Sequence, residues 1–110
     1  MPTPHRPSIA VRRTLRKLGS DIRDARRQRK LPMAVVAERA FTSRSTLQKI
    51  EAGDSNVGIG IYASVLQALG FLDGLGSIAN LSSDELGQSL ARANLPRRVH
   101  IKKQDRAVLP

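Results

Sequence analysis

The sequence has 110 residues with no cysteine and no tryptophan, and its only aromatic residues are Phe41, Tyr62 and Phe71. Without cysteine, neither a disulfide framework nor a thiolate metal site can form. The sequence has no run of about 18 apolar residues, so we expect no membrane-spanning helix. Its first residues also lack the apolar run of a signal peptide. We therefore expect a cytoplasmic protein.

Positive charge is the strongest compositional feature. The chain has 19 Lys and Arg against 9 Asp and Glu, a net charge of +10, and a pI near 11.5. Residues 1–30 contain 10 basic and 2 acidic residues (+8), residues 31–80 contain 3 and 4 (−1), and residues 81–110 contain 6 and 3 (+3). A polyanionic partner follows from this excess: nucleic acid first, and an anionic membrane surface second.

The 40% hydrophobic content is mostly aliphatic, which favours small packed helices over a sheet and predicts the all-α class. A first helix is predicted from an N-cap at Ser8 to near Lys30, with a candidate break at Gly19. Its apolar residues recur at spacings of three and four: Val11, Leu15, Leu18, Ile22 and Ala25. Its other face is basic: Arg12, Arg13, Arg16, Lys17, Arg23, Arg27 and Arg29.

Two short helices are predicted next. The first of them has Pro32 in its first turn, and its buried side is predicted to be Val36, Ala37 and Ala40. The second starts at Thr42 or Ser43 and ends at Gly53 in a left-handed C′ conformation. Leu47 and Ile50 of this helix point to the core. Four polar residues must then face outward: Arg44, Ser45, Gln48 and Lys49.

A fourth helix is predicted within residues 56–71, with an apolar stripe of Ile61, Val65, Leu66 and Leu69, and a short turn of helix follows it. The C-terminal part opens with a capping box, Ser82 to Glu85, and has a thin stripe of Leu86, Leu90 and Ala93. Val99 and Ile101 then alternate with basic residues, as in a strand. We expect a flexible arm (1–8), a DNA-binding domain (9–80) and a C-terminal extension (81–110).

The two short helices and the tight turn at Phe41 and Thr42 form a helix-turn-helix pattern. In this pattern the second helix enters the major groove and presents donors to base edges. Arg44 can offer a bidentate fork to guanine, and Lys49 lies one turn further along. Short donors able to meet phosphates or nearby bases accompany them: Ser43, Ser45 and Thr46.

Residues 18–71 resemble the Cro/cI-type helix-turn-helix domain of the XRE family of bacterial and phage regulators. The motifs that carry the resemblance are "IRDARRQRKL", "SRSTLQKIEAG" and "VLQALGF". The resemblance implies a compact five-helix domain in which Arg26 pairs with Glu51. It also implies that bases are contacted by Arg44, Ser45 and Lys49, with Ser43, Thr46 and Gln48 near phosphates. The family usually has Gln where this chain has Met33, so a DNA contact by residue 33 is in doubt.

The C-terminal segment "SSDELGQSLARANLPRRVHIKK" is similar to the extension of small antitoxins that bind HipA-type kinase toxins. This second resemblance implies a transcriptional repressor that binds an inverted-repeat operator in double-stranded DNA as a homodimer and also holds a HipA-type kinase toxin. We expect the dimer to form through residues 59–78. The alternative is a stand-alone XRE-family regulator without a toxin partner.

Each of these interpretations has a less specific alternative. Arg44 and Lys49 could simply belong to a helix face that is exposed to solvent. The basic first helix could lie on a membrane, but it lacks the Trp, Phe and dense Leu of interfacial helices. His5 and His100 have no Cys or carboxylate cluster beside them, so we expect no metal, cofactor or catalytic role. A nucleic-acid enzyme is disfavoured because no paired carboxylates or nucleophile arrangement is visible.

Overall fold

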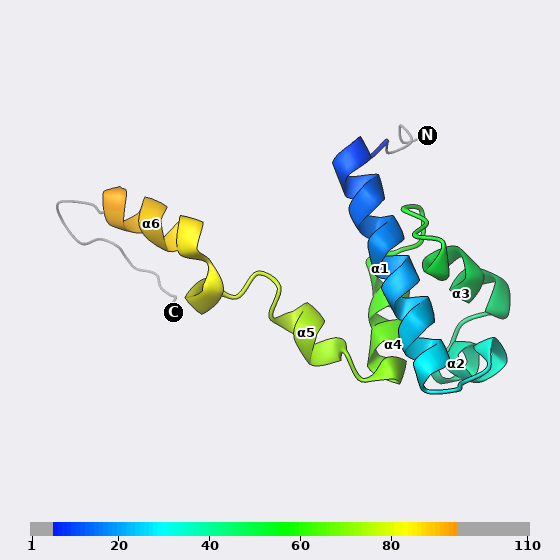
Figure 1. Cartoon of the computed structure of the whole chain (residues 1–110). Helices are drawn as coiled ribbons and strands as arrows, with labels where there is room; N and C mark the ends of the chain where they lie inside the picture. Colours follow the sequence, from blue (N-terminus) through cyan, green and yellow to red (C-terminus); the bar gives the residue numbers. More distant parts are fainter. Residues whose placement is uncertain (1–5, 95–110) are drawn as a thin grey trace. The chain divides into compact units, whose positions relative to one another are not determined.

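The computed structural model describes residues 6–94, and within this range it contains six α-helices, one 3₁₀-helix and no strand (Figure 1). The predicted all-α class is confirmed. The elements are α1 Ile9–Gln28, α2 Met33–Arg39, α3 Arg44–Glu51, α4 Ile59–Leu69, α5 Leu72–Gly76, η1 Leu81–Ser83 and α6 Glu85–Ala93. The chain divides into two compact units between Ser77 and Ile78. The predicted strand at Val99 and Ile101 lies outside the described residues, as do both histidines.

Helix α1 begins as predicted, with Ser8 Oγ accepting a hydrogen bond from the Val11 amide at 3.2 Å. It continues without interruption through Gly19, so the predicted break there is wrong. Gly19 is buried because the end of α3 lies directly against it. A Cβ at Gly19 would lie 2.5 Å from the carbonyl oxygen of Ile50 and 2.7 Å from that of Glu51. This glycine therefore permits a close approach of two helices.

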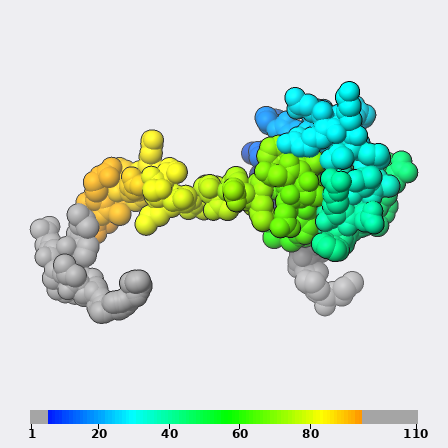
Figure 2. All heavy atoms as spheres, turned by 90° about the horizontal axis from the view of Figure 1, so that it is seen from below, coloured from blue at the N-terminus to red at the C-terminus, as the bar shows by residue number. Residues whose placement is uncertain are grey.

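The hydrophobic core of the first unit is built by α1 to α4, whose atoms close into one continuous body in the space-filling view (Figure 2). Four predicted apolar positions are completely buried in the structure: Val36, Leu47, Ile50 and Val65. Ala37 and Ala40 are also buried, as their spacing predicted. Partly buried Leu18, Leu31 and Leu75 pack around this core, so α5 contributes to it through one leucine.

The apolar face of α4 differs from the predicted one at one position. Ile61 is 37% exposed, and its expected place is taken by Tyr62, which is 6% exposed. The Tyr62 hydroxyl donates a hydrogen bond of 2.7 Å to the carbonyl oxygen of Asp54, in the loop after α3. Desolvation, and then the nearby Asp54 carboxylate, raise the pKa of Tyr62 above its ordinary value. A ring with a polar tip suits this site because it fills the core and also satisfies a loop carbonyl.

Helices α1 to α4 are each followed, within two residues of their last residue, by a residue with positive φ: Lys30 (55°), Phe41 (56°), Gly53 (78°) and Gly70 (91°). After α3 the Gly53 amide donates to the carbonyl of Ile50 (2.9 Å) and the Asp54 amide to that of Lys49 (3.0 Å), which completes a Schellman motif. The predicted left-handed conformation of Gly53 is confirmed. Lys30 and Phe41 adopt it at a cost of roughly 1–2 kcal/mol each. Pro32 is the N-cap of α2, just before the predicted first turn.

The second unit contains η1 and α6 within its described part. The predicted capping box is wrong, because Ser82 lies in η1 and its amide and hydroxyl both donate to Asn80 Oδ1. Asp84 caps α6 instead, and its Oδ1 accepts from the Gly87 amide at 2.8 Å. The apolar stripe of α6 is exposed, with Leu86 at 71% and Leu90 at 52%.

A substitution at Gly19 tests the contact between α1 and α3. Helix propensity alone predicts that Gly19→Ala stabilises the protein by about 1 kcal/mol. We expect the opposite sign, a loss of about 1–3 kcal/mol in urea unfolding, because the methyl group would meet backbone atoms that cannot rotate away. The matched control is Gly60→Ala in α4, where a Cβ would meet nothing within 4 Å. A stabilised Gly19→Ala variant would contradict the packing described here.

Candidate nucleic-acid interface

The outward face of α3 is separated cleanly from its buried face. Leu47 and Ile50 are 0% exposed and hold the helix on the core. The polar residues that the sequence analysis placed outward are all exposed: Arg44, Ser45, Gln48 and Lys49. Within residues 6–94, the Arg44, Gln48 and Lys49 side chains form no hydrogen bond or ion pair. Their donors are therefore available to an external ligand.

The first turn of α3 is held by a small hydroxyl network. Ser43 is the N-cap, and its Oγ accepts a hydrogen bond from the Thr46 amide at 3.1 Å. The same hydroxyl lies 2.9 Å from Thr46 Oγ1, to which it donates, and 3.2 Å from Ser45 Oγ. Ser43 and Thr46 thus stabilise the start of the helix, and Ser45 is the hydroxyl of this group nearest to the outward face. This arrangement orients the end of α3 that carries Arg44.

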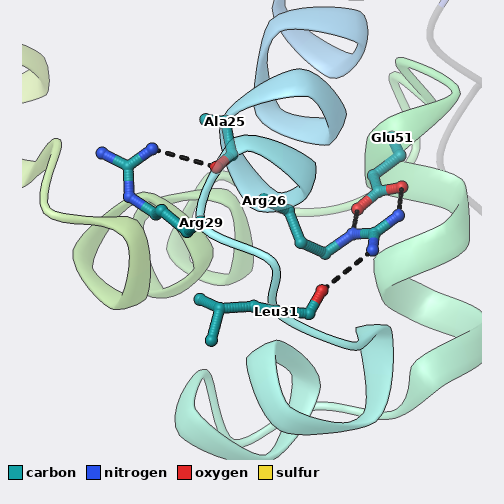
Figure 3. A network of polar contacts seen from close by, with 5 residues as sticks. All are labelled: Ala25, Arg26, Arg29, Leu31 and Glu51. Atoms are coloured by element: carbon teal, nitrogen blue, oxygen red, sulfur yellow. Dashed lines mark hydrogen bonds and ion pairs between the residues drawn. The ribbon is translucent and has the colours of Figure 1, made fainter.

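The end of α3 is tied to α1 by a buried ion pair (Figure 3). Arg26 Nε donates to Glu51 Oε2 at 2.7 Å, and Nη2 donates to Oε1 at 3.2 Å. The side chains are only 11% and 7% exposed, so both charged groups are almost completely removed from solvent. Arg26 Nη1 also donates to the carbonyl of Leu31 at 3.1 Å. One guanidinium group therefore joins α1, the turn before α2, and the last turn of α3.

A hollow of about 300 Å³ lies between α1 and the outward side of α3. It is lined by Arg23, Arg26, Arg27, Met33, Gln48, Glu51 and Ala52. Met33 is half-buried and packs against the core, so its thioether brings no hydrogen-bond donor to the hollow. Among residues 6–94, the donors in this hollow that have no partner belong to Gln48 and to two arginines of α1, Arg23 and Arg27. Sequence reasoning placed those arginines only on a general basic face.

Within the described range, no group of three or more His, Asp or Glu side chains is placed to hold a metal ion. No helix in that range is long and apolar enough to span a membrane. The arrangement is a positively charged surface around an exposed polar helix. Such a surface can bind an anionic polymer and read it through hydrogen bonds.

The fold and this surface define a helix-turn-helix protein of the DNA-binding regulator class, in which α2 supports the outward-facing α3. A family model described as "Helix-turn-helix domain" matches residues 17–75, which is more than half of the chain. The chain belongs to this helix-turn-helix domain family. No curated protein and no solved structure matches the chain.

Sequence reasoning missed several residues that position the site. Gly19 allows α3 to approach α1, and Tyr62 anchors the loop that follows α3. A glycine within an otherwise regular amphipathic helix is a signal for close packing, and this signal could have indicated the role of Gly19. Tyr62, Val65, Leu66 and Leu69 follow the i, i+3, i+4, i+7 spacing of one helix face, so periodicity could have pointed to Tyr62. Ile61 lies about 100° from Tyr62 around the helix, and only its aliphatic character favoured it.

The buried ion pair can be tested through stability. Glu51→Gln leaves the Arg26 charge buried without an opposite charge, so we expect a loss of about 3–5 kcal/mol in chemical denaturation. In the double variant Arg26→Met with Glu51→Leu no charge is stranded, and most of this loss should disappear. Equal destabilisation by the single and the double variant would show that stranded charge is not the cause.

Proposed function

We propose that this protein is a sequence-specific transcriptional repressor that binds an inverted-repeat operator as a homodimer in the cytoplasm and also acts as the antitoxin of a HipA-type kinase. The observation that carries the DNA-binding part is the exposed polar face of α3, whose two ends are held by the Ser43 cap and by the Arg26–Glu51 pair. A helix held at both ends presents its side chains in one orientation, which base reading requires.

In this proposal, Arg44, Ser45 and Lys49 contact base edges. Arg44 is the first residue of α3, and its exposed guanidinium group has the bidentate geometry that matches guanine O6 and N7 in the major groove. Ser45 and Lys49 lie on the same side of the helix, four residues apart. The other members of the proposed site are Ser43 and Thr46, in the first turn of α3, and the exposed Gln48, and we assign these three to contacts with the DNA backbone.

The homodimer is supported by apolar side chains that the first unit leaves exposed on and after α4. Ile59 is 75% exposed, Phe71 is 42% exposed and Leu72 is 40% exposed. A second copy that covers these side chains would bury surface that water now contacts. A two-fold dimer of this kind would place its two α3 helices about 34 Å apart, one turn of DNA, and would match an inverted repeat.

The toxin-binding role is supported by the second unit. Its described part has a capped helix with an exposed apolar stripe formed by Leu86 and Leu90, and Leu81 of η1 is 78% exposed. Such a stripe is too narrow to form a core by itself and is suited to a protein partner. The alternative is a stand-alone regulator of the same family, in which this unit serves only dimerisation or contacts with the DNA backbone.

A pull-down of the tagged full-length protein from its native cells would test the whole proposal, with the bound DNA sequenced and the bound proteins identified. We expect a short inverted repeat together with one kinase-like protein. In that case, deletion of residues 81–110 should abolish the protein complex and leave operator binding intact. A recovered operator without a stable protein partner would support the stand-alone regulator instead.

Substitution of Arg44 tests base reading. On the operator, Arg44→Ala should weaken binding by about 1–3 kcal/mol and relax the preference at one base position. Arg44→Lys keeps the charge but not the bidentate fork, so it should restore affinity for random-sequence DNA more than it restores discrimination. Quantitative gel-shift titrations on operator and random duplexes would measure both. Equal losses on the two duplexes would show that Arg44 contacts only phosphate.

A further inference from the structure

The basic residues of α1 do not form one uniform face. At about 100° per residue, Arg12, Arg16, Arg23 and Arg27 fall within about 60° of one another around the helix. We call these four residues the arginine row. Arg13 and Lys17 are centred about 90° further round the same helix. The sequence analysis grouped all six together, because it had no neighbouring element to distinguish one side of α1 from another.

The arginine row lies along the side of α1 that borders α3. Arg23 and Arg27 line the same hollow as Gln48 and Ala52, which belong to the outward side of α3. A Cβ at Gly53 would lie 2.6 Å from the Cα atom of Arg16, so the end of α3 lies directly beside the middle of the row.

At the other end of the row, Arg12 lines a second hollow, of about 380 Å³. The other residues that line it are Arg6, Pro7, Ser55 and Asn56. Ser55 and Asn56 belong to the loop that follows α3. The row therefore follows α3 and this loop from one hollow to the other.

The charges of the row are not neutralised within residues 6–94. None of its four guanidinium groups forms an ion pair or donates a hydrogen bond in that range. Arg13 likewise forms no ion pair or hydrogen bond within residues 6–94, whereas three other basic groups of α1 and its C-cap are engaged. Lys17 Nζ lies 2.7 Å from Asp21 Oδ2, Arg26 is paired with Glu51, and Arg29 donates to the Ala25 carbonyl and lies 5.0 Å from the centre of the Phe71 ring. All four side chains of the row are exposed.

We propose that the arginine row binds consecutive phosphates of one DNA strand beside the groove that α3 enters. This inference rests on the DNA binding proposed above and adds a second contact surface to it. From Arg12 to Arg27 the helix rises about 22 Å, so the row is long enough to lie beside several phosphates of one strand. Met33 cannot donate to a phosphate in the hollow between α1 and α3, and Arg23 and Arg27 provide the donors there.

Two double variants of the full-length protein with the same loss of charge test the row. Arg23→Ala with Arg27→Ala removes two members of the row, and Arg13→Ala with Lys17→Ala removes a pair with the same spacing from the adjacent side of α1. Their affinities are measured over a range of salt concentrations on a short random-sequence duplex and on a duplex selected from a random pool. Circular dichroism melting shows that both variants are folded.

We expect the row variant to lose affinity alike on both duplexes, with a salt slope reduced by about 1.8, or 0.9 for each lost phosphate contact. The Arg13 and Lys17 variant should change the slope by much less. An equal reduction of the salt slope in the two variants would show that only total charge matters, and it would overturn the proposal that the arginine row contacts phosphates. Binding by the wild-type protein would still support DNA binding in that case. If the wild-type protein binds neither duplex, the proposed function and this inference both fail.

Discussion

The contact between α1 and the end of α3 is the constraint on which the rest of the first unit depends. The backbone at the end of α3 lies so close to Gly19 that no side chain fits there. The backbone of α1 lies equally close to Gly53, where a side chain would not fit either. The Arg26–Glu51 pair joins the same two helices, and its side chains are only 11% and 7% exposed. A buried pair of this kind adds little net stability, but any other arrangement of α3 would strand one of its charges. The contact therefore determines where α3 lies more than it determines how stable the domain is.

The surface proposed to bind DNA follows from that constraint. With Leu47 and Ile50 buried and Glu51 turned to Arg26, the remaining side chains of α3 have only the outward direction left. The same contact brings the arginine row of α1 alongside α3, so that donors suited to bases and donors suited to phosphates lie next to each other. Base contacts give a DNA-binding protein its specificity, while phosphate contacts give it orientation and most of its salt-dependent affinity. One packing contact serves both purposes here.

Much of the first unit could be predicted from the sequence because its signals are local. Ser8, Ser43 and Gly53 mark the ends of helices through hydrogen bonds and φ angles that involve only nearby residues. The spacing of Leu47 and Ile50 likewise identifies a buried face without knowledge of what covers it. Other features needed more than one local signal. The continuity of α1 through Gly19 depends on the backbone of α3 that lies against it. The exchange of Tyr62 for Ile61 depends on the Asp54 carbonyl, which accepts the Tyr62 hydrogen bond, and the cap of α6 depends on which of two candidates, Ser82 or Asp84, reaches its first turn.

The sequence by itself determined the all-α class, the two helices of the helix-turn-helix motif, and which residues of α3 are polar and outward. These properties depend on periodicity and capping, which act over one or two turns of helix. Only the tertiary structure decided that Arg26 and Glu51 are buried, and that Arg12, Arg16, Arg23 and Arg27 border α3 while Arg13 and Lys17 do not. The physical reason is that the basic side chains of α1 point in several directions around the helix axis. Which of them lie beside α3 depends on where the two helices can approach most closely, and Gly19 and Gly53 allow that approach.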